Sequence, residues 1–254
     1  LATKSVRYRP RFGAVWNTAV ALAATVAVRA ATDWPQFLGP TRNGTYAGPP
    51  LADAWGAAGP KVVWRKQVGQ GFAGPAVVGN RVILFHRVGN EEVLESLDAA
   101  TGNSTWRYAY RTTYRDDFGF DEGPRAVPVV VDGVIYTFGA EGQLHAVDLA
   151  KGTRLWSEDT MKRFGVPKGF FGAAGSPLVE GGRVIANVGG EKAGIVAFDA
   201  KTRKVIWTAT DDEASYSSGV GASFAGQRVA MFFTRSGLDG LEPAAGAVAF
   251  QQGW

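Results

Sequence analysis

Hydrophobic and polar residues form short segments that repeat about every fifty residues along this chain. In the first unit, two apolar runs, residues 76–78 and 81–85, flank the turn Gly79-Asn80. The same arrangement of run, turn and run returns at residues 129–138, 178–188 and 222–233. Such runs around Gly-containing turns predict β-hairpins, because these turns need positive φ angles. The pattern therefore predicts four hairpins, and nothing in the repeats indicates a long amphipathic helix.

A second pattern follows each hairpin and consists of an acidic residue, a turn, and an aromatic residue eight positions after the acid. The four copies pair Asp98 with Trp106, Asp148 with Trp156, Asp199 with Trp207, and Glu242 with Phe250. The apolar residues that precede the acid predict a third strand, and the aromatic residue lies on a predicted fourth strand. Each unit is thus predicted to be a four-stranded antiparallel sheet, and repeated units of this length are typical of propeller blades.

Both repeated residue types have a structural interpretation. A large aromatic side chain at a fixed place on the outer strand can pack between neighbouring blades while its indole N–H reaches a backbone partner. An Asp before a turn can accept hydrogen bonds from the backbone N–H groups of that turn. We therefore interpret Asp98, Asp148 and Asp199 as structural rather than catalytic residues.

The repeated phrase resembles the tryptophan-docking motif of quinoprotein-type (PQQ-like) β-propellers, Ala-x-Asp-x-x-Thr-Gly-x-x-x-Trp. Ala146 and Asp148 match its start, whereas Ser96 replaces the Ala of the first copy and Arg203 replaces the Gly of the third. Residues 33–40 resemble the opening of bacterial extracytoplasmic members of this group. The resemblance implies an all-β propeller over residues 59–254, in a family whose members typically have seven or eight blades.

The number of predicted strands indicates an incomplete ring. Residues 61–66, with Trp64, have the pattern of a fourth strand that no hairpin precedes. The chain then has five predicted fourth strands and only four sets of the other three. We expect a truncated propeller of about four blades, half a ring, whose open blade edges favour self-association. The alternative is a small closed ring of four blades with one spare strand.

The excess of positive charge lies in the first thirty residues, which contain Lys4, Arg7, Arg9, Arg11 and Arg29. Without these five, 22 basic and 23 acidic residues remain, so the formal net charge of +4 does not describe the repeats. A nearly neutral body without a basic run argues against nucleic-acid binding.

Residues 1–30 are predicted to be an export signal, with basic residues before an apolar stretch and the small residues Val28 and Ala30 around a cleavage site. A short membrane anchor is the alternative. Because the chain has no Cys, it has no site for a lipid anchor of the lipoprotein type. We expect a periplasmic or secreted protein, with residues 31–58 as an irregular lead-in to the repeats.

Three long segments join the fourth strand of one unit to the first strand of the next. We call residues 114–125, 164–172 and 211–218 the first, second and third connectors, and the side on which they emerge the connector face. In a radial array they should emerge on one side, near the central channel. Their candidate binding residues are Asp116, Asp117, Asp121, Glu122, Arg125, Lys168, Asp211, Asp212, Glu213 and Tyr216.

Clustered carboxylates suit a hard cation such as Ca²⁺, and nearby aromatic residues suit a planar ligand. The simpler interpretation is that these acids cap solvated turns. The family resemblance makes pyrroloquinoline quinone (PQQ) and Ca²⁺ possible cofactors, but no residue matches a dehydrogenase site. We therefore expect a non-catalytic scaffold that binds a protein partner or a small ligand at the connector face. The alternative is a PQQ- and Ca²⁺-dependent alcohol or sugar dehydrogenase.

Overall fold

A computed structural model describes residues 33–224 and 226–254 of the chain, so the predicted export signal lies outside the described residues. Its strands are β1 (Ala76–Val78), β2 (Arg81–Val88), β3 (Glu91–Asp98), β4 (Ser104–Arg111), β5 (Val129–Val131), β6 (Val134–Phe138), β7 (Gln143–Asp148), β8 (Arg154–Asp159), β9 (Leu178–Glu180), β10 (Arg183–Gly190), β11 (Ala193–Asp199), β12 (Val205–Ala209), β13 (Val220–Phe224), β14 (Gln227–Phe233), β15 (Gly237–Leu241) and β16 (Val248–Gly253). One short helix, α1 (Thr160–Phe164), follows β8. Among the described residues, no helix has both the length and the apolar character needed to span a membrane.

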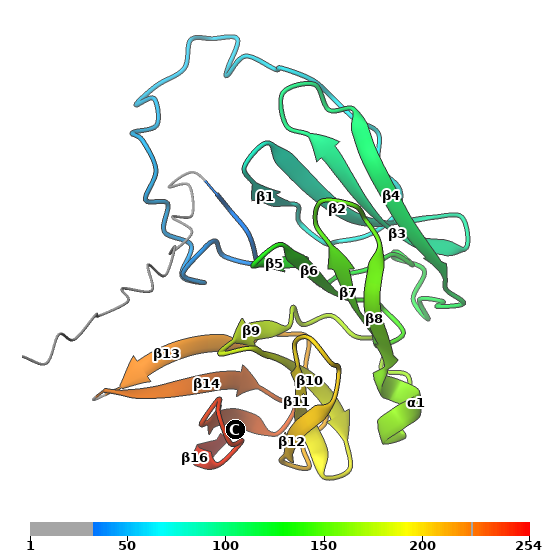
Figure 1. The fold of residues 1–254 in the computed structure, drawn as a ribbon, viewed down its shortest axis with the longest axis vertical. Coiled ribbons are helices and arrows are strands. Elements are labelled where there is room, and N and C mark those ends of the chain that lie inside the picture. Colours follow the sequence, from blue (N-terminus) through cyan, green and yellow to red (C-terminus); the bar gives the residue numbers. More distant parts are fainter. Residues whose placement is uncertain (1–32, 225) are drawn as a thin grey trace, which may run out of the picture.

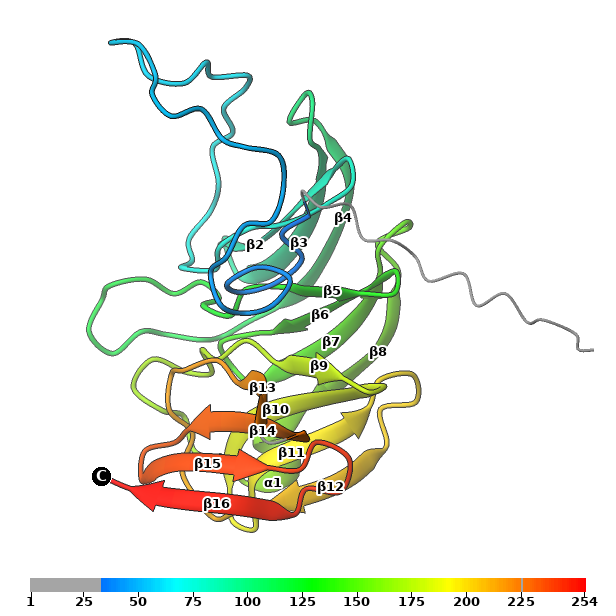
Figure 2. The same ribbon diagram turned by 90° about the vertical axis from the view of Figure 1, so that its left-hand side faces the viewer.

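The strands form four separate antiparallel sheets of four strands, each in sequence order, as the repeats predict. The sheets follow one another along an arc, with β1, β5, β9 and β13 as their first strands (Figures 1 and 2). Strand β5 contacts both β1 and β9, so these first strands line the inside of the arc. The array is a partial ring of about four blades, as expected, and not a small closed ring.

The hairpin between the third and fourth strands of each blade is irregular at one fixed place. The strand register shifts by one residue next to the pairs Ser96–Trp106, Ala146–Trp156, Ala197–Trp207 and Gly240–Phe250. Such a bulge sharpens the local twist and redirects the side chains beside it. A small residue lies directly opposite each aromatic residue, and this explains the Ala at the start of the repeated phrase.

Each tryptophan docks on the corresponding turn of the next blade. The indole Nε1 of Trp106 donates to the Leu149 carbonyl at 3.0 Å, and that of Trp156 donates to the Ala200 carbonyl at 2.9 Å. Trp207 donates in the same way to the Pro243 carbonyl at 3.1 Å. Trp156 and Trp207 are buried between blades, as predicted, whereas Trp106 is partly exposed.

The acids of the repeated phrase have the structural role that the sequence indicates. Asp98 Oδ1 accepts hydrogen bonds from the backbone N–H groups of Ala100 and Thr101 and from the Thr101 hydroxyl. Asp199 Oδ1 accepts the equivalent three bonds, and Asp148 Oδ1 accepts the two backbone bonds. The bond from the Thr101 hydroxyl is the largest cause that holds the pKa of Asp98 below its ordinary value. These carboxylates therefore shape the turns on which the indoles dock.

The prediction of a strand at residues 61–66 is wrong. This segment is irregular and pairs with no strand of the described residues. Trp64 nevertheless makes the expected docking contact, since its Nε1 donates to the Ala99 carbonyl of the first blade at 2.8 Å. The docking interaction therefore does not require a formed blade around the tryptophan.

The segment before the repeats is irregular, yet it reaches all four blades along the inside of the arc. Trp34 pairs with Val77 of β1, and the Pro35 carbonyl accepts from the Val130 N–H of β5 at 2.8 Å. Arg42 donates to the Gly219 carbonyl at 2.6 Å and to the Pro177 carbonyl, just before β13 and β9. Burial lowers the pKa of Arg42 to about 10, so its guanidinium is still charged at neutral pH.

We expect Gly152→Ala to destabilise the chain more than Gly133→Ala. Both residues have positive φ angles, +68° and +77°, so an added Cβ costs roughly 1–2 kcal/mol in either turn. A Cβ on Gly152 would also lie 2.6 Å from the Trp106 ring, whereas one on Gly133 meets nothing within 4 Å. Urea unfolding should therefore show about 1 kcal/mol of additional loss for Gly152→Ala. Equal losses would contradict the docking role of this turn.

We expect Arg42→Met to lower the free energy of unfolding by about 2–4 kcal/mol, because it leaves buried carbonyl groups without a donor. Arg228→Met is the matched control, since Arg228 pairs with Glu180 at 2.6 Å on the surface and should cost about 1 kcal/mol or less. Thermal unfolding of both variants measures the difference. A loss for Arg42→Met as small as the control's would show that residues 33–44 do not hold the blades together.

Candidate functional site

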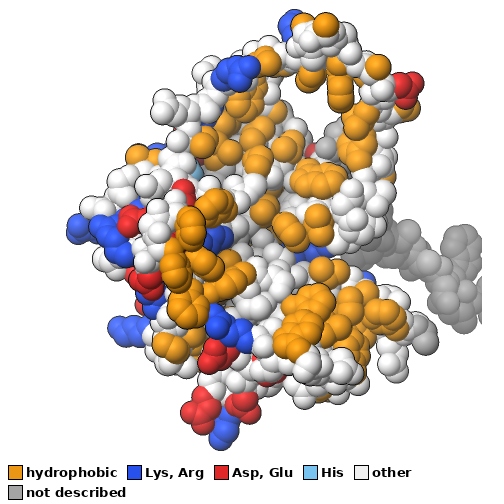
Figure 3. Space-filling view, turned by 180° about the vertical axis from the view of Figure 1, so that it is seen from behind, with side chains coloured by type: hydrophobic (Ala, Val, Ile, Leu, Met, Phe, Trp, Pro, Cys, Tyr) orange, Lys and Arg blue, Asp and Glu red, His pale blue; other side chains and the backbone are white. Residues whose placement is uncertain are grey.

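The three connectors emerge on one face of the arc, as predicted from radial repetition. In each blade the strands run antiparallel, so the link to the next blade lies at the same end as the turn between the second and third strands. This end is on the left in Figure 2. Figure 3 is seen from this side and shows a band of hydrophobic side chains among charged ones.

The first connector is held by a buried ion pair. Asp116 Oδ2 lies 2.9 Å from Arg125 Nη2, and the side chain of Asp116 is fully buried. Its other oxygen accepts from the backbone N–H groups of Phe118 and Phe120. Burial opposes ionisation of Asp116, but these donors and the Arg125 charge hold its pKa below the ordinary value. Both predicted residues, Asp116 and Arg125, therefore shape the loop.

The other acids of this connector also have partners within the chain. Asp121 accepts from the Gly123 N–H at 2.7 Å, and Glu122 pairs with Arg115 at 2.8 Å. Asp117 lies 2.6 Å from the Nζ of Lys168, which joins the first connector to the second. This ion pair is exposed, and it brings two predicted site residues from different connectors into direct contact.

The acids of the third connector point to different places. Asp211 accepts from the Lys192 N–H at 2.5 Å, and Glu213 lies 3.5 Å from Arg235. Asp212 faces Asp239 of β15, and the pKa of Asp239 is raised by burial and by this neighbouring carboxyl group. The predicted acids therefore do not form one cluster across the connectors.

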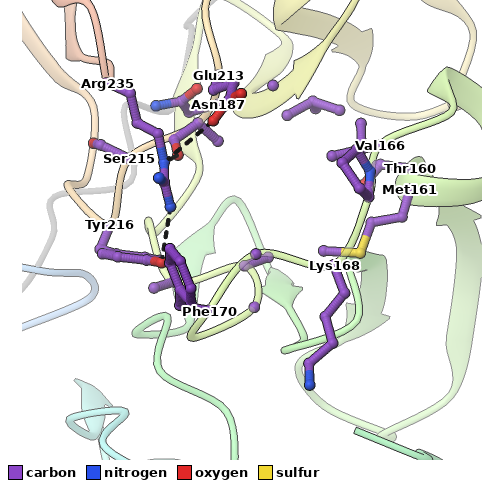
Figure 4. A pocket seen from close by; sticks show the side chains of 18 of the residues that line it. Thr160, Met161, Val166, Lys168, Phe170, Asn187, Glu213, Ser215, Tyr216 and Arg235 are labelled. Atoms are coloured by element: carbon purple, nitrogen blue, oxygen red, sulfur yellow. Dashed lines mark hydrogen bonds and ion pairs between the residues drawn. The ribbon is translucent and has the colours of Figure 1, made fainter. Parts of the chain in front are cut away.

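Tyr216 is the predicted site residue that lies in the middle of the face. Its hydroxyl accepts from Arg235 at 3.1 Å and from the Phe171 N–H at 3.3 Å (Figure 4). The guanidinium of Arg235 lies 5.7 Å from the Phe170 ring centroid and 5.8 Å from that of Tyr216, within reach of a cation–π interaction. Arg235 belongs to the turn between β14 and β15 and is absent from the predicted site.

A cluster of aromatic side chains covers the connector face. We call it the aromatic cluster, and it consists of Phe118, Phe120, Phe170, Phe171 and Tyr216. Phe118 and Phe171 are close, with ring centroids 5.5 Å apart, although they belong to different connectors. Phe118 is 56% exposed, Phe120 72% and Phe170 55%. The sequence signal for these residues was the pair of aromatic runs 118–120 and 170–171, which the sequence analysis interpreted as suited to a planar ligand.

A pocket of about 480 Å³ lies beside the aromatic cluster and between the second and third connectors. Figure 4 shows Met161, Val166 and Lys168 on one side of the pocket, and Phe170, Tyr216 and Arg235 on the other. This volume lies within the range of small-ligand and side-chain binding sites. Five of the ten predicted binding residues line the pocket: Asp117, Lys168, Asp211, Glu213 and Tyr216.

The described residues do not form a binding site for Ca²⁺. They contain no group of three or more His, Cys, Asp or Glu side chains placed to hold a metal. Apart from Asp212, which faces Asp239, the acids of the connectors already accept hydrogen bonds or pair with Arg and Lys. Quinone binding therefore stays a prediction from the family resemblance.

The fold and its docking turns define the chain as a PQQ-type β-propeller. Residues 45–163 and 89–253 match the family profile described as outer membrane protein assembly factor BamB, so the chain belongs to this family. Among solved structures, quinohemoprotein alcohol dehydrogenase from Comamonas testosteroni matches 88% of this chain and 41% of its own, with a TM-score of 0.62 and 19% identity. BamB from Moraxella catarrhalis matches 75% of this chain and 51% of its own, with a TM-score of 0.53 and 18% identity. These structural likenesses show the fold alone.

Curated relatives include quinoprotein dehydrogenases. Quinohemoprotein alcohol dehydrogenase ADH-IIG of Pseudomonas putida is 29% identical over 48% of this chain and 17% of its own length. The 1-butanol dehydrogenase (cytochrome c) of Thauera butanivorans is 33% identical over 40% of this chain and 15% of its own. The chain thus spans less than a fifth of the length of these relatives.

We expect Asp116→Asn to loosen the first connector, because it leaves the Arg125 charge buried without its carboxylate. Removing one partner of such an ion pair leaves the other charge without compensation, so this change should disturb the loop more than the loss of an exposed pair does. Asp117→Asn is the matched control, since its pair with Lys168 is exposed and should cost less than about 1 kcal/mol. Limited proteolysis should cleave residues 114–125 faster in Asp116→Asn than in the control. Equal cleavage rates would show that the ion pair does not fix this loop.

Proposed function

We propose that this chain is an exported PQQ-type β-propeller that acts as a non-catalytic scaffold and binds a protein partner at its connector face. The observation that carries the proposal is the aromatic cluster, in which rings from three connectors contact one another. Four of its five rings are exposed, those of Phe118, Phe120, Phe170 and Tyr216. Exposed apolar groups gathered in one patch are typical of protein-binding surfaces. Aromatic residues together with Arg are enriched in such interfaces.

The rigidity of the face supports the same function. The Asp116–Arg125 pair fixes the loop that carries Phe118 and Phe120, and the Asp117–Lys168 pair ties it to the second connector. Arg235 and Tyr216 connect the third connector to the turn after β14. A surface that is ordered before binding loses less conformational entropy when a partner docks. These contacts therefore prepare the face for association.

The second candidate function is a PQQ- and Ca²⁺-dependent alcohol or sugar dehydrogenase, because curated relatives are named a quinohemoprotein alcohol dehydrogenase and a 1-butanol dehydrogenase. The two functions predict different results with the whole protein that contains this chain. After incubation with PQQ and Ca²⁺, a dehydrogenase reduces an electron-accepting dye when an alcohol is added. A scaffold gives the same dye reduction with and without PQQ.

We also propose that the protein is periplasmic or secreted. The proposal rests on the predicted export signal at residues 1–30 and on the family, whose description names an outer membrane assembly factor. A protein that works there meets its partners outside the cytoplasm, so a partner should be sought in the cell envelope.

Photo-cross-linking from the two faces tests the scaffold function. We would place the photoreactive amino acid p-benzoylphenylalanine at Phe120 of the connector face, and at Lys151, in an exposed turn at the opposite ends of the strands. In a cell-envelope extract of the source organism, we expect one identified protein to cross-link at position 120 and not at position 151. The cross-link should weaken when Phe170→Ala is added, because this removes a ring of the aromatic cluster. The same products from both positions would contradict the proposal.

A further inference from the structure

The pocket of about 480 Å³ beside the aromatic cluster has a neutral floor and a charged rim. The buried side chains of its lining, which we call the floor, are Phe138, Thr160, Asn187 and Val188. The acidic and basic side chains of its lining, which we call the rim, are all exposed: Asp117, Lys168, Glu191, Asp211, Glu213 and Arg235. An occupant that reaches the floor therefore leaves the charged groups and the water around them.

One oxygen of the floor is buried without a hydrogen-bond donor. Asn187, on β10, lines the pocket in Figure 4 and is 9% exposed, and its Nδ2 donates to the Phe233 carbonyl at 3.2 Å. Because a carbonyl oxygen can only accept, this bond fixes which end of the side-chain amide is the nitrogen. Among the described residues, no group donates to the other end, Oδ1. Since a buried acceptor without a donor is unfavourable, an occupant that donates to Oδ1 would gain binding free energy.

The hydroxyl groups of Thr160 and Ser215, which also line the pocket, already have acceptors. Thr160 donates to the Gly142 carbonyl at 2.8 Å, and Ser215 donates to the Phe233 carbonyl at 2.5 Å. An amide or carboxylate oxygen of an occupant, buried beside these hydroxyls, would itself lack a donor. An indole avoids this cost, because its N–H donates and it has no acceptor. A tryptophan side chain therefore matches a floor that holds an unpaired acceptor.

A Lys or Arg side chain also only donates, but its charge does not suit the floor. A cation that reaches Asn187 would exchange its water shell for neutral side chains, and burying a charge without a counter-ion is costly. Two of the four acids of the rim pair with Lys168 and Arg235. The other two, Glu191 and Asp211, are exposed, where an ion pair contributes little. The floor therefore favours a neutral donor over a cation.

The walls of the pocket are apolar and suit a flat ring. Met161 and Val166 lie on one side, and Phe170 of the aromatic cluster lies on the other (Figure 4). A thioether against an aromatic ring and two rings packed edge to face are both favourable contacts. A tryptophan held in a pocket and surrounded by weaker contacts is typical of the residues that dominate the affinity of an interface.

We propose that this pocket binds a tryptophan side chain of the partner protein. The indole ring lies between Met161 and Phe170, and its N–H donates to Asn187 Oδ1, just as the indoles of the repeats donate to backbone carbonyls. This inference rests on the proposed function, because the tryptophan belongs to the protein that docks on the aromatic cluster. The aromatic cluster then contacts the residues of the partner on either side of the tryptophan.

NMR of the methionine methyl groups in the whole protein tests the inference, because this chain contains two methionines, Met161 in the pocket and Met231 on β14. The probe is N-acetyl-tryptophanamide, and its matched control is the benzothiophene analogue, which has sulfur in place of the N–H. We expect the tryptophan probe to shift the Met161 signal, assigned with Met161→Leu, and to leave that of Met231 unchanged. The benzothiophene analogue should bind about tenfold more weakly, because it cannot donate to Asn187.

Asn187→Leu should lower the affinity for the tryptophan probe and remove its advantage over the benzothiophene analogue. The ratio of the two affinities is the decisive readout, since a variant that only disturbs the fold weakens the binding of both probes alike. Asn103→Leu, in an exposed turn at the opposite ends of the strands, is the matched control and should keep the tenfold ratio.

Other results would overturn the inference while leaving the proposed function in place. Equal affinities of the two probes for the unchanged protein would show that Asn187 does not receive an indole N–H. An unshifted Met161 signal, or tighter binding of N-acetyl-lysinamide, would show that the pocket does not select an indole. Partner binding that Asn187→Leu leaves unchanged would show that the partner does not use the pocket. The cross-linking result at position 120 decides the scaffold function separately, because a partner can cover the aromatic cluster without a side chain in the pocket.

Discussion

The arrangement of this molecule depends on one contact, the indole of each blade docked on the turn of the next. The indole N–H reaches a carbonyl group at 2.9–3.1 Å in the three junctions between blades. In two of these junctions the turn that receives the indole is shaped by an Asp, Asp148 or Asp199, that accepts N–H groups of the turn, and in the third Glu242 stands in place of the Asp. Trp64 makes the same contact without a blade of its own, which shows that the docking contact is local.

The docking contacts between blades determine where the connectors emerge. Because every blade meets its neighbour in the same way, the connectors must emerge on one face, and residues far apart in sequence come together there. Inside the arc, Arg42 and the segment around it hold the first strands of the blades. The connectors are therefore free to vary in sequence on a scaffold that does not depend on them, and their own ion pairs order them. A constant framework of blades that carries variable loops is typical of folds that serve many functions.

The repeat spacing was enough to predict the four blades, the docking tryptophans and the role of Asp98, Asp148 and Asp199. These features depend on contacts within a repeat or between identical positions of adjacent repeats. The strand at residues 61–66 could not be predicted correctly, because a strand also needs a partner that the sequence of the segment does not reveal. Arg42 was missed for a related reason: it acts on backbone carbonyls, which have no sequence signature.

The candidate site was predicted only in part. The connectors were located correctly, but the acids in them were considered as ligands for a cation, whereas most are partners of nearby Arg, Lys and backbone N–H groups. Asp117 and Lys168 are 51 positions apart, so only the folded chain brings them together. The exposure of Phe118 and Phe170 is equally invisible in the sequence, since aromatic residues in loops can also be buried. Their contact across two connectors is the observation on which the proposed docking surface rests.

Hydrogen–deuterium exchange of the whole protein, alone and with its cross-linked partner identified and purified, tests the central claim most directly. The account predicts that the partner slows exchange in residues 114–125, 164–172 and 211–218. It predicts no change in the turns at the other ends of the strands, residues 99–103, 149–153 and 200–204. Protection of those turns, with unchanged exchange in the connectors, would contradict the claim that the connector face is the binding surface.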